Sequence, residues 1–182
     1  VENKIYFQKD LRFLEDEVFS WDILSFCKNI RYIRQQLYTF YVYPNVNTGS
    51  SEGIYRGYSI SNFLLAKNHV IDCFKKRNMN ISESEKLGDQ ALIFFVISAL
   101  ISFSRSIIWG KVDYKNGKIQ LKELIKKIIE NLEINKAIKN YNCSKNENKW
   151  IPRAINWKMS KLLEFMCYRR AKEIILLRKN SI

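Results

Sequence analysis

Glycine and proline are scarce in this chain of 182 residues, which holds only 6 Gly and 2 Pro. Folds made of many short strands need these residues at their tight turns, so a β-sandwich or β-barrel is disfavoured and long helices are favoured. Hydrophobic residues make up 47% of the sequence and aromatic residues 14%, which is enough for a core and excludes wholesale disorder. The length gives room for one domain, or for one small domain with an appended half.

Metal-binding and thiol motifs are also missing. The four cysteines (Cys27, Cys73, Cys143 and Cys167) form no C-x-x-C pair, and His69 is the single histidine. A zinc knuckle or a catalytic Cys/His pair has too few residues to form, so we expect reduced cytosolic thiols. His69 falls inside an expected helix, where a packed or surface histidine is a better interpretation than a metal ligand.

The sequence has no secretory signal peptide and no apolar run long enough for a typical membrane span. It opens with the polar residues Val1–Lys4 and lacks an initiator Met, so we expect it to begin inside a longer sequence. The most apolar run, Ala91–Phe103, has thirteen residues, whereas a spanning helix needs about 20. We expect this run to form a helix buried at the centre of a bundle.

The first sixty residues predict a mixture of strands and one helix. Glu15–Cys27 has apolar residues at helical spacing and acidic residues in its first turn, which suit the positive end of a helix dipole. Pro44–Ser59 is a polar loop. Segments with the aromatic, β-branched or apolar residues typical of strands or extended chain are Lys4–Phe7, Leu11–Leu14, Ile30–Ile33 and Gln36–Tyr43.

Helices dominate after that loop. Ser82–Glu85 resembles a capping box that opens a long helix ending near Ile108, and Asn116-Gly117 predicts a turn over Lys111–Lys118. We therefore predict an α+β fold, mostly α, with a small partial α/β piece in residues 1–59 and a helical bundle in residues 60–182. The other expected features are a helix over Ile60–Lys76, a helix with the apolar stripe Leu121, Leu124, Ile125, Ile128 and Leu132, a polar connector over Asn140–Lys149, and a last helix with Met159, Leu162, Leu163 and Met166 on one face.

Basic residues outnumber acidic ones, 31 to 18, which gives a net charge of +13 and implies an anionic partner. Residues 118–182 hold 16 Lys or Arg against 6 Asp or Glu, or +10 of that charge. A solvated basic face explains this simply. An anionic membrane surface explains it as well, with Trp150, Trp157 and Phe165 as interfacial anchors. Nucleic acid is less favoured, because Tyr168–Arg170 resembles a stacking platform only loosely and no RNP or zinc-finger signature is present.

The acidic cluster Glu15–Glu17 lies between an expected extended segment and an expected helix start, where a carboxylate can project into a cleft. Inverting glycosyl transfer needs such a group as a general base, to take the proton of the acceptor hydroxyl as it attacks the sugar carbon. Helical periodicity alone favours a simpler interpretation, in which the three acids only cap the helix.

The segment Ile5–Leu24 resembles the second half of the bacterial family 2 glycosyltransferases with the GT-A fold. In that family an extended segment ends in a Glu-Asp motif, followed by an aromatic residue and a helix, as in Leu11-Arg12-Phe13-Leu14-Glu15-Asp16-Glu17-Val18-Phe19. Ile30–Tyr41 is similar to the two strands that follow in the family. The resemblance covers residues 1 to about 51, and it implies that Asp16 is the general base and that Glu15 supports it.

The family continues into an Arg and a Ser-x-Thr near the donor diphosphate. Tyr41 stands in place of that Arg and Val46 in place of that Ser, and only Thr48 matches. Arg56, or backbone N–H groups around Thr48, would then contact the diphosphate. Carbohydrate sites pair aromatic faces with amide hydrogen bonds, and the candidate sugar contacts of these types are Trp21, Tyr43, Asn45 and Asn47.

The family's donor-binding half carries an Asp-x-Asp metal motif, and no Asp-x-Asp occurs in these 182 residues. The resemblance implies Mn²⁺ or Mg²⁺ on the nucleotide phosphates of the complete enzyme, with ligands mostly outside this chain. We expect the acceptor-side part of an inverting glycosyltransferase, inactive alone, that moves a sugar from a nucleotide sugar to a saccharide or lipid-linked acceptor. The product would be a bacterial surface polysaccharide such as capsule or lipopolysaccharide. The expected location is cytoplasmic, peripheral on the inner face of the cytoplasmic membrane.

A hypothesis from another class remains open beside the transferase. The chain would then be a non-enzymatic basic helical module that binds nucleic acid or a partner protein, and Glu15–Glu17 would only cap a helix. The two hypotheses differ at Asp16, whose carboxylate is essential to an enzyme and dispensable to a binding module.

Overall fold

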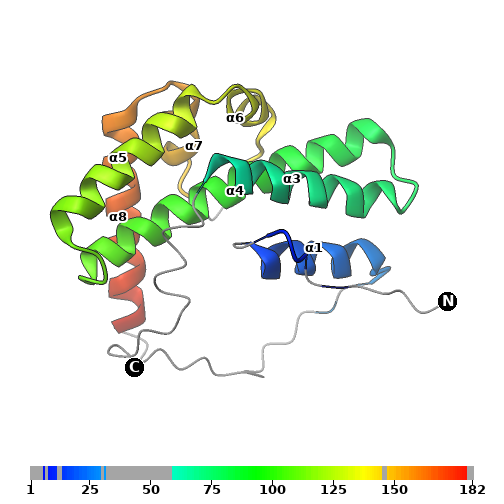
Figure 1. The fold of residues 1–182 in the computed structure, drawn as a ribbon, viewed down its shortest axis with the longest axis horizontal. Coiled ribbons are helices and arrows are strands. Elements are labelled where there is room, and N and C mark those ends of the chain that lie inside the picture. Colours follow the sequence, from blue (N-terminus) through cyan, green and yellow to red (C-terminus); the bar gives the residue numbers. More distant parts are fainter. Residues whose placement is uncertain are drawn as a thin grey trace.

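The computed structural model describes residues 6, 8–11, 14–29, 31, 59–144 and 147–179, and the structural statements below concern these residues. They form seven α-helices and one short 3₁₀-helix (Figure 1). The helices are α1 (Glu15–Phe26), α3 (Ile60–Lys75), α4 (Ile81–Ile108), α5 (Tyr114–Glu130), α6 (Leu132–Ala137), η1 (Ile138–Asn140), α7 (Trp150–Asn156) and α8 (Ser160–Lys179).

The predicted α+β class is wrong, because no residue in the described ranges lies in a β-strand and the helices form a bundle. The extended segment expected over Leu11–Leu14 is replaced by a turn. The N–H of Leu11 donates to the carbonyl of Gln8 at 3.3 Å, and Leu14 has a left-handed φ of 72° that no strand adopts. Leu11 and Leu14 are both buried at a spacing of three residues, which fits helical packing rather than the alternation of a strand. The expected strands lie outside the described residues, apart from Tyr6 and Arg31: Lys4–Phe7, Ile30–Ile33 and Gln36–Tyr43.

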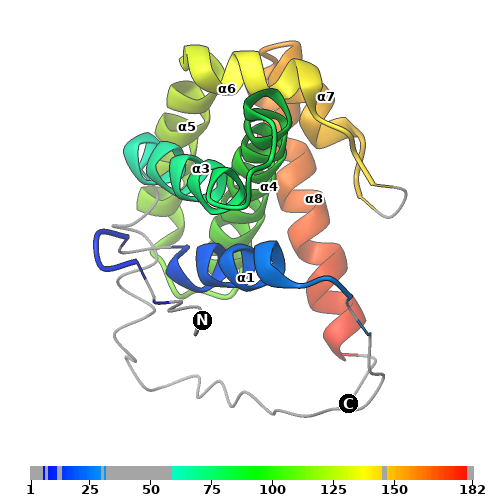
Figure 2. The same cartoon turned by 90° about the vertical axis from the view of Figure 1, so that its right-hand side faces the viewer.

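Helix α4 runs through the middle of the bundle, with α3, α5, α6, α7 and α8 against it (Figure 2). Its run Ala91–Phe103 carries no charge, and Leu92, Phe95 and Leu100 in this run are fully buried. The prediction of a buried central helix is therefore confirmed. By length and composition alone α4 is also long and apolar enough to cross a membrane, but 61% of its most apolar window is buried by the other helices.

The beginnings of α4 and α5 differ from the predicted ones. Asn80 caps α4 through a bond from the N–H of Ser82 to its side-chain oxygen at 3.0 Å, so the predicted Ser82–Glu85 capping box is wrong by two residues. Asp113 caps α5 by accepting from the N–H of Asn116 at 2.9 Å. The predicted turn over Lys111–Lys118 is therefore shorter, and Asn116-Gly117 lies within α5, because a capping Asp outweighs the turn preference of Asn-Gly.

The apolar stripe of the following helix is confirmed up to Ile128. Its residues Leu121, Leu124, Ile125 and Ile128 are buried in α5. The helix ends there, because Asn131 adopts an extended backbone and its side chain caps α6 by accepting from the N–H of Ile134 at 3.0 Å. Leu132, expected to continue the stripe, is therefore 82% exposed.

A buried group of charges joins three helices. The Lys67 ammonium of α3 lies 2.8 Å from Asp89 of α4 and 3.3 Å from Glu133 of α6. Burial opposes the charge of Lys67, but the bonds and charges of the two carboxylates outweigh it and raise the pKa of Lys67. Beside this group, α3 and α4 approach closely at Gly88, where an added Cβ would overlap with the Ile71 side chain. The bundle is thus fixed by both polar and apolar contacts.

Candidate functional site

The candidate catalytic acids lie in the first turn of α1, directly after the strained backbone of Leu14. Leu14 is a large, buried residue in the left-handed region, at φ 72° and ψ 12°. Its carbonyl nevertheless accepts the first helical bond, from the N–H of Val18 at 2.9 Å. The Leu14 side chain makes no capping hydrogen bond. The buried Leu14 therefore fixes the direction in which the acidic turn leaves the core.

Asp16 is exposed, and Glu15 and Glu17 on either side of it are half-buried. The Oδ1 of Asp16 accepts a bond from the N–H of Glu17 at 2.9 Å, so its carboxylate sits at the positive end of the helix dipole. The Ser20 hydroxyl donates to the Asp16 carbonyl at 2.8 Å. Burial, and then the charge of Asp16, raises the pKa of Glu17. The turn thus holds the exposed carboxylate of Asp16 beside that of Glu17, whose pKa is raised.

Helix α1 lies against α3 (Figures 1 and 2). Trp21, an expected sugar contact, is partly buried, and its ring meets Phe74 of α3 edge-on at 6.0 Å between ring centres. The guanidinium of Arg77 lies 3.5 Å from the centre of the Phe26 ring. The helix over Glu15–Cys27 is confirmed with an end at Phe26.

The buried face of α1 differs from the apolar residues that predicted the helix. Val18 and Asp22 are buried, whereas Ile23 and Cys27 from that set are exposed. Asp22 lies against Cys73 of α3, where burial, followed by the Asp22 charge and hydrogen bond, raises the pKa of the Cys73 thiol to about 12. Packing against α3, rather than apolar periodicity, therefore selects the face that α1 buries.

The structure places Glu15, Asp16 and Trp21 on one helix. The remaining expected substrate contacts lie outside the described residues: Tyr43, Asn45, Asn47, Thr48 and Arg56. Within the described residues no group of three or more His, Cys, Asp or Glu side chains could hold a metal ion. The residues described therefore do not fit a Mn²⁺ or Mg²⁺ site, and no catalytic step below passes through a metal.

A His–Asp pair near the site escaped the sequence analysis. The Nε2 of His69, in α3, lies 2.9 Å from Oδ2 of Asp10, in the turn that leads to α1. A hydrogen bond from His69 is the largest cause that lowers the pKa of Asp10. The two residues are 59 positions apart, and no motif connects them. The contact ties the chain before the acidic turn to the bundle.

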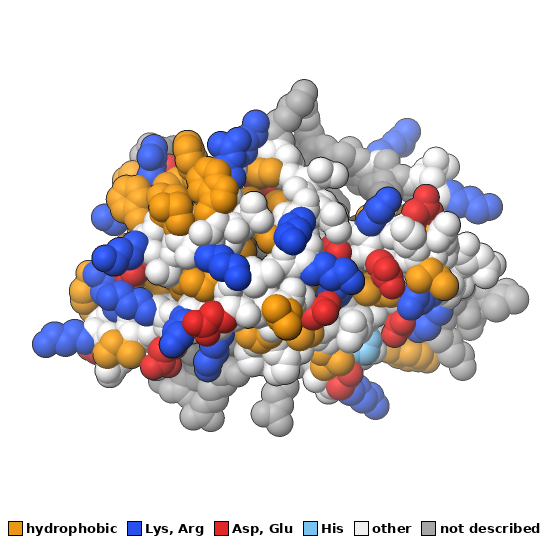
Figure 3. Space-filling view, turned by 90° about the horizontal axis from the view of Figure 1, so that it is seen from above, with side chains coloured by type: hydrophobic (Ala, Val, Ile, Leu, Met, Phe, Trp, Pro, Cys, Tyr) orange, Lys and Arg blue, Asp and Glu red, His pale blue; other side chains and the backbone are white. Residues whose placement is uncertain are grey.

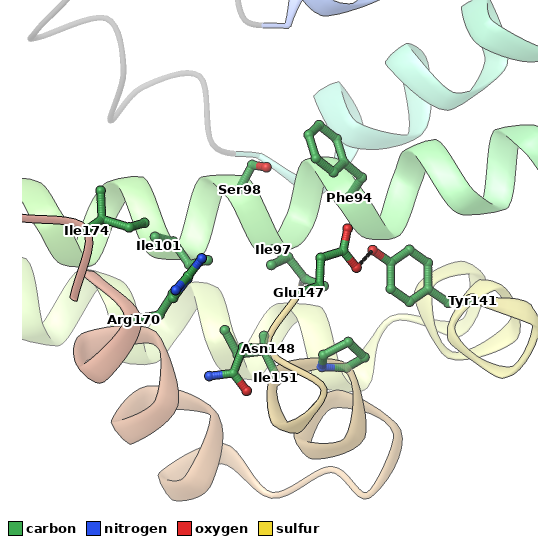
Figure 4. A pocket seen from close by; sticks show the side chains of 11 residues that line it. Phe94, Ile97, Ser98, Ile101, Tyr141, Glu147, Asn148, Ile151, Arg170 and Ile174 are labelled. Atoms are coloured by element: carbon green, nitrogen blue, oxygen red, sulfur yellow. Dashed lines mark hydrogen bonds between the residues drawn. The ribbon is translucent and has the colours of Figure 1, made fainter. Parts of the chain in front are cut away.

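A cavity of about 170 Å³ lies elsewhere in the bundle, between α4, α7, α8 and the connector before α7 (Figure 4). Its walls are mainly apolar, and none of the candidate site residues on α1 lines it. At one side the Tyr141 hydroxyl donates to Oε2 of Glu147 at 2.8 Å, a bond that Figure 4 marks. The described lining residues are Phe94, Ile97, Ser98, Ile101, Tyr141, Glu147, Asn148, Ile151, Pro152, Arg170 and Ile174.

The comparisons with known proteins give no match: no protein-family model, no curated protein and no solved structure is similar to this chain. No known relative therefore assigns a role to the residues of the acidic turn.

Proposed function

We propose that the chain is the acceptor-side part of an inverting glycosyltransferase, with Asp16 as its general base. The observation that carries the proposal is the exposed Asp16 carboxylate, directed out of the core by the left-handed Leu14. Backbone strain of this kind costs about 1–3 kcal/mol and gathers at functional sites. Of the resemblance to family 2 enzymes, the Glu-Asp-Glu sequence supports the proposal, whereas the extended segment expected before it is a turn.

In this proposal Asp16 accepts the proton of an acceptor hydroxyl while the hydroxyl oxygen bonds to the anomeric carbon of the donor sugar. The bond from that carbon to the nucleoside diphosphate breaks, and the diphosphate leaves with its electron pair. The bond from the N–H of Glu17 to Oδ1 of Asp16 holds this carboxylate in place at the start of α1 before the reaction. Glu15, which directly precedes Asp16, has the supporting role in the same turn.

The donor-binding residues would come from outside these 182 residues, since no Asp-x-Asp occurs among them. A bound Mn²⁺ or Mg²⁺ would neutralise the phosphates of the leaving nucleotide there. The acceptor would be a saccharide or a lipid-linked saccharide in the synthesis of a capsule or lipopolysaccharide.

The proposal is tested by Asp16→Asn in the full-length enzyme that contains this chain. The variant is mixed with UDP-glucose, UDP-galactose and GDP-mannose in turn, and the release of UDP or GDP is measured. Loss of a general base lowers the rate about 10²–10⁴-fold. Circular dichroism checks that the fold is intact.

Glu83→Gln is the matched control, because Glu83 is an exposed acid in the first turn of α4. It removes the same favourable interaction with a helix dipole, about 0.3–1 kcal/mol, away from the candidate site. We expect Glu83→Gln to keep full activity. If both variants keep full activity, Asp16 only stabilises its helix, and the binding-module hypothesis moves ahead.

A second experiment tests the missing donor half. We expect the 182-residue chain alone to release no UDP or GDP from the same donors, because it lacks the donor's metal motif. Measurable sugar transfer by this chain contradicts that part of the proposal and would require a donor site within the chain itself.

A further inference from the structure

Two exposed tryptophans lie side by side along α7, Trp150 at its first residue and Trp157 just after its last. Trp150 is 50% exposed and Trp157 is 52% exposed, and their rings meet edge-on at 6.4 Å between centres. They are seven positions apart, which places them on the same side of the short helix α7. The opposite side of α7 is buried in the bundle through Ile151, Ala154 and Ile155. The buried side of α7 therefore fixes the position of the tryptophans, although the tryptophans themselves are not part of the core.

The chain segment that carries these tryptophans has positive charges only. Residues 149–161 contain four basic residues and no acidic residue. The four are exposed, and none forms an ion pair within the described part of the chain. We name the exposed residues Lys149, Trp150, Arg153, Trp157, Lys158, Met159 and Lys161 the basic tryptophan corner.

The turn between α7 and α8 keeps a lysine where glycine is the usual residue. The N–H of Lys158 donates to Ile155 at 3.0 Å and that of Met159 donates to Ala154 at 2.9 Å, the two bonds of a Schellman motif. This motif puts Lys158 in the left-handed region, at φ 55°. The chain thus accepts backbone strain at a position where the side chain adds a fourth positive charge to the corner.

We propose that the basic tryptophan corner docks the protein onto a membrane surface that contains anionic lipids. Tryptophan rings settle at the boundary of headgroups and acyl chains, because one edge is polar and the body is apolar. Lysine and arginine beside them pair with anionic headgroups. On the face seen from above, hydrophobic side chains gather at one end with lysine and arginine around them (Figure 3).

Charge complementarity favours a lipid surface over the other occupants. A second copy of this chain would bring four more positive charges against the corner and repel it. Nucleic acid shares the negative charge, but stacking on bases needs aromatic faces, whereas Arg153 lies over the face of Trp150, 5.3 Å from the ring centre. This inference does not depend on the transferase activity, and its tests measure binding alone.

The first test measures binding of the full chain to vesicles of phosphatidylcholine and phosphatidylglycerol in equal amounts, by sedimentation. We expect binding that weakens as salt rises, and none to pure phosphatidylcholine. Each basic residue near such a surface contributes roughly fivefold in affinity, so replacing Lys149, Arg153, Lys158 and Lys161 by Gln reduces binding more than about a hundredfold.

The matched control removes the same net charge elsewhere. Lys28, Lys75, Lys76 and Lys86 are exposed, and they lie just after α1 and around the turn between α3 and α4. Replacing these four by Gln should weaken binding by less than about tenfold, because only the general attraction falls. Equal losses in the two fourfold variants overturn the proposal, since binding would then follow net charge alone.

The second test locates the tryptophans at the lipid boundary. The chain has four tryptophans, so Trp21→Phe with Trp109→Phe leaves only the corner pair, and Trp150→Phe with Trp157→Phe removes it. Vesicles with brominated lipid chains should quench the fluorescence of the first variant but not that of the second. Quenching of the second variant alone overturns the proposal, because Trp21 or Trp109 would then face the lipid.

Lys158→Gly should change thermal stability and vesicle binding in opposite directions, which separates docking from stability. Glycine relaxes the left-handed backbone, so the melting temperature should rise by about 2–4 °C, while vesicle binding falls roughly fivefold. Unchanged binding in this variant overturns the role of Lys158. The proposal as a whole is also overturned if the chain binds no vesicles but binds an oligouridine RNA, or self-associates, through the same tryptophans.

Discussion

Helices α1 and α7 each carry a tryptophan that meets another aromatic ring edge-on, and the two contacts do different things. Trp21 meets Phe74 at 6.0 Å and 74°, and Trp150 meets Trp157 at 6.4 Å and 65°. The first pair joins two helices that are far apart in the sequence. The second pair lies within α7 and the residue that follows it, and about half of each side chain is exposed. Similar geometry therefore gives a fold contact in α1 and an exposed surface in α7.

The arginines beside the two pairs repeat the contrast. Arg77, just after α3, covers the Phe26 ring of α1 at 3.5 Å, whereas Arg153 covers Trp150 of its own helix at 5.3 Å. A contact between distant elements loses its energy when either element detaches, so it supports the fold. A contact within one helix survives detachment of that helix, so it contributes less to the fold. What each contact contributes to the stability of the fold therefore depends on whether it joins distant elements and is buried, and not on the geometry of the rings.

The largest effect is expected where a polar contact joins three helices inside the bundle. Lys67→Met leaves the buried Asp89 carboxylate without its cation, and the free energy of unfolding should fall by about 3 kcal/mol. Arg169→Gln is the control, because Arg169 pairs with Glu173 only on the exposed side of α8 and should cost less than about 0.5 kcal/mol. Urea unfolding followed by circular dichroism measures both. An equal fall in the free energy of unfolding for the two variants would contradict the difference expected between buried and exposed ion pairs.

The same group gives a pH dependence. The pKa of Lys67 is higher in the folded chain than the ordinary value of 10.5, so the folded state holds this proton more tightly. This contribution to stability is complete below that value and is lost as the pH rises through the folded pKa. Lys67→Met should therefore remove part of the alkaline loss of stability, measured as urea midpoints across the alkaline range.

The next effect tests the two tryptophan helices directly. Trp21→Ala opens space against Phe74 and should lower the free energy of unfolding by about 2 kcal/mol, less than for a fully buried ring. Trp157→Ala should change it by less than about 0.5 kcal/mol, because half of that ring is exposed and it joins no other helix. Hydrogen exchange adds a local measure, since only Trp21→Ala should reduce amide protection along α1. A larger loss of stability in Trp157→Ala would contradict our assignment of α7.

Long helices were the part of the fold that the sequence predicted well. Ile60–Lys76 and the helix to Ile108 appear within a residue at those ends, because local propensity and burial favour the same state there. The predictions failed where two local signals compete, as at Asp113, which caps α5 and draws Asn116-Gly117 into the helix. The break at Asn131 and the separate helix α7 depend on packing between helices, which periodicity does not encode.

The candidate site was predictable only in its residue types. The Glu15–Glu17 cluster and its helix follow from the sequence, whereas the left-handed Leu14 does not, because no local rule puts a leucine there. The His69–Asp10 contact depends on how the turn before α1 meets α3. The paired tryptophans of α7 were expected as membrane anchors, but only the structure brings their rings together beside four exposed cations.

A smaller effect is expected within the acidic turn. The pKa of Glu17 is raised above 4.5 by burial and then by the charge of Asp16, so its ionised form is disfavoured in the folded chain. The stability of the fold is then highest below that value and falls as the pH rises through the folded pKa. Glu17→Gln should therefore stabilise the chain at neutral pH by less than about 1 kcal/mol, measured by urea unfolding. Destabilisation by this variant would mean that the Glu17 carboxylate makes a favourable contact in the fold.

The smallest effect should be confined to the turn before α1. His69 lowers the pKa of Asp10 below 3.8, so the contact favours the folded turn above that value and is lost as the pH falls through the folded pKa of Asp10. Asp10→Asn removes this dependence, and hydrogen exchange at the Leu11 amide, which bonds to Gln8, reports it. Wild type and variant are compared at each pH, so that the intrinsic exchange rate cancels. We expect the wild-type amide to be better protected at neutral pH and equally protected in strong acid. Equal protection at every pH would show that the His69–Asp10 contact does not hold the turn and that α1 is held by its own contacts with α3, which would sharpen the contrast with α7.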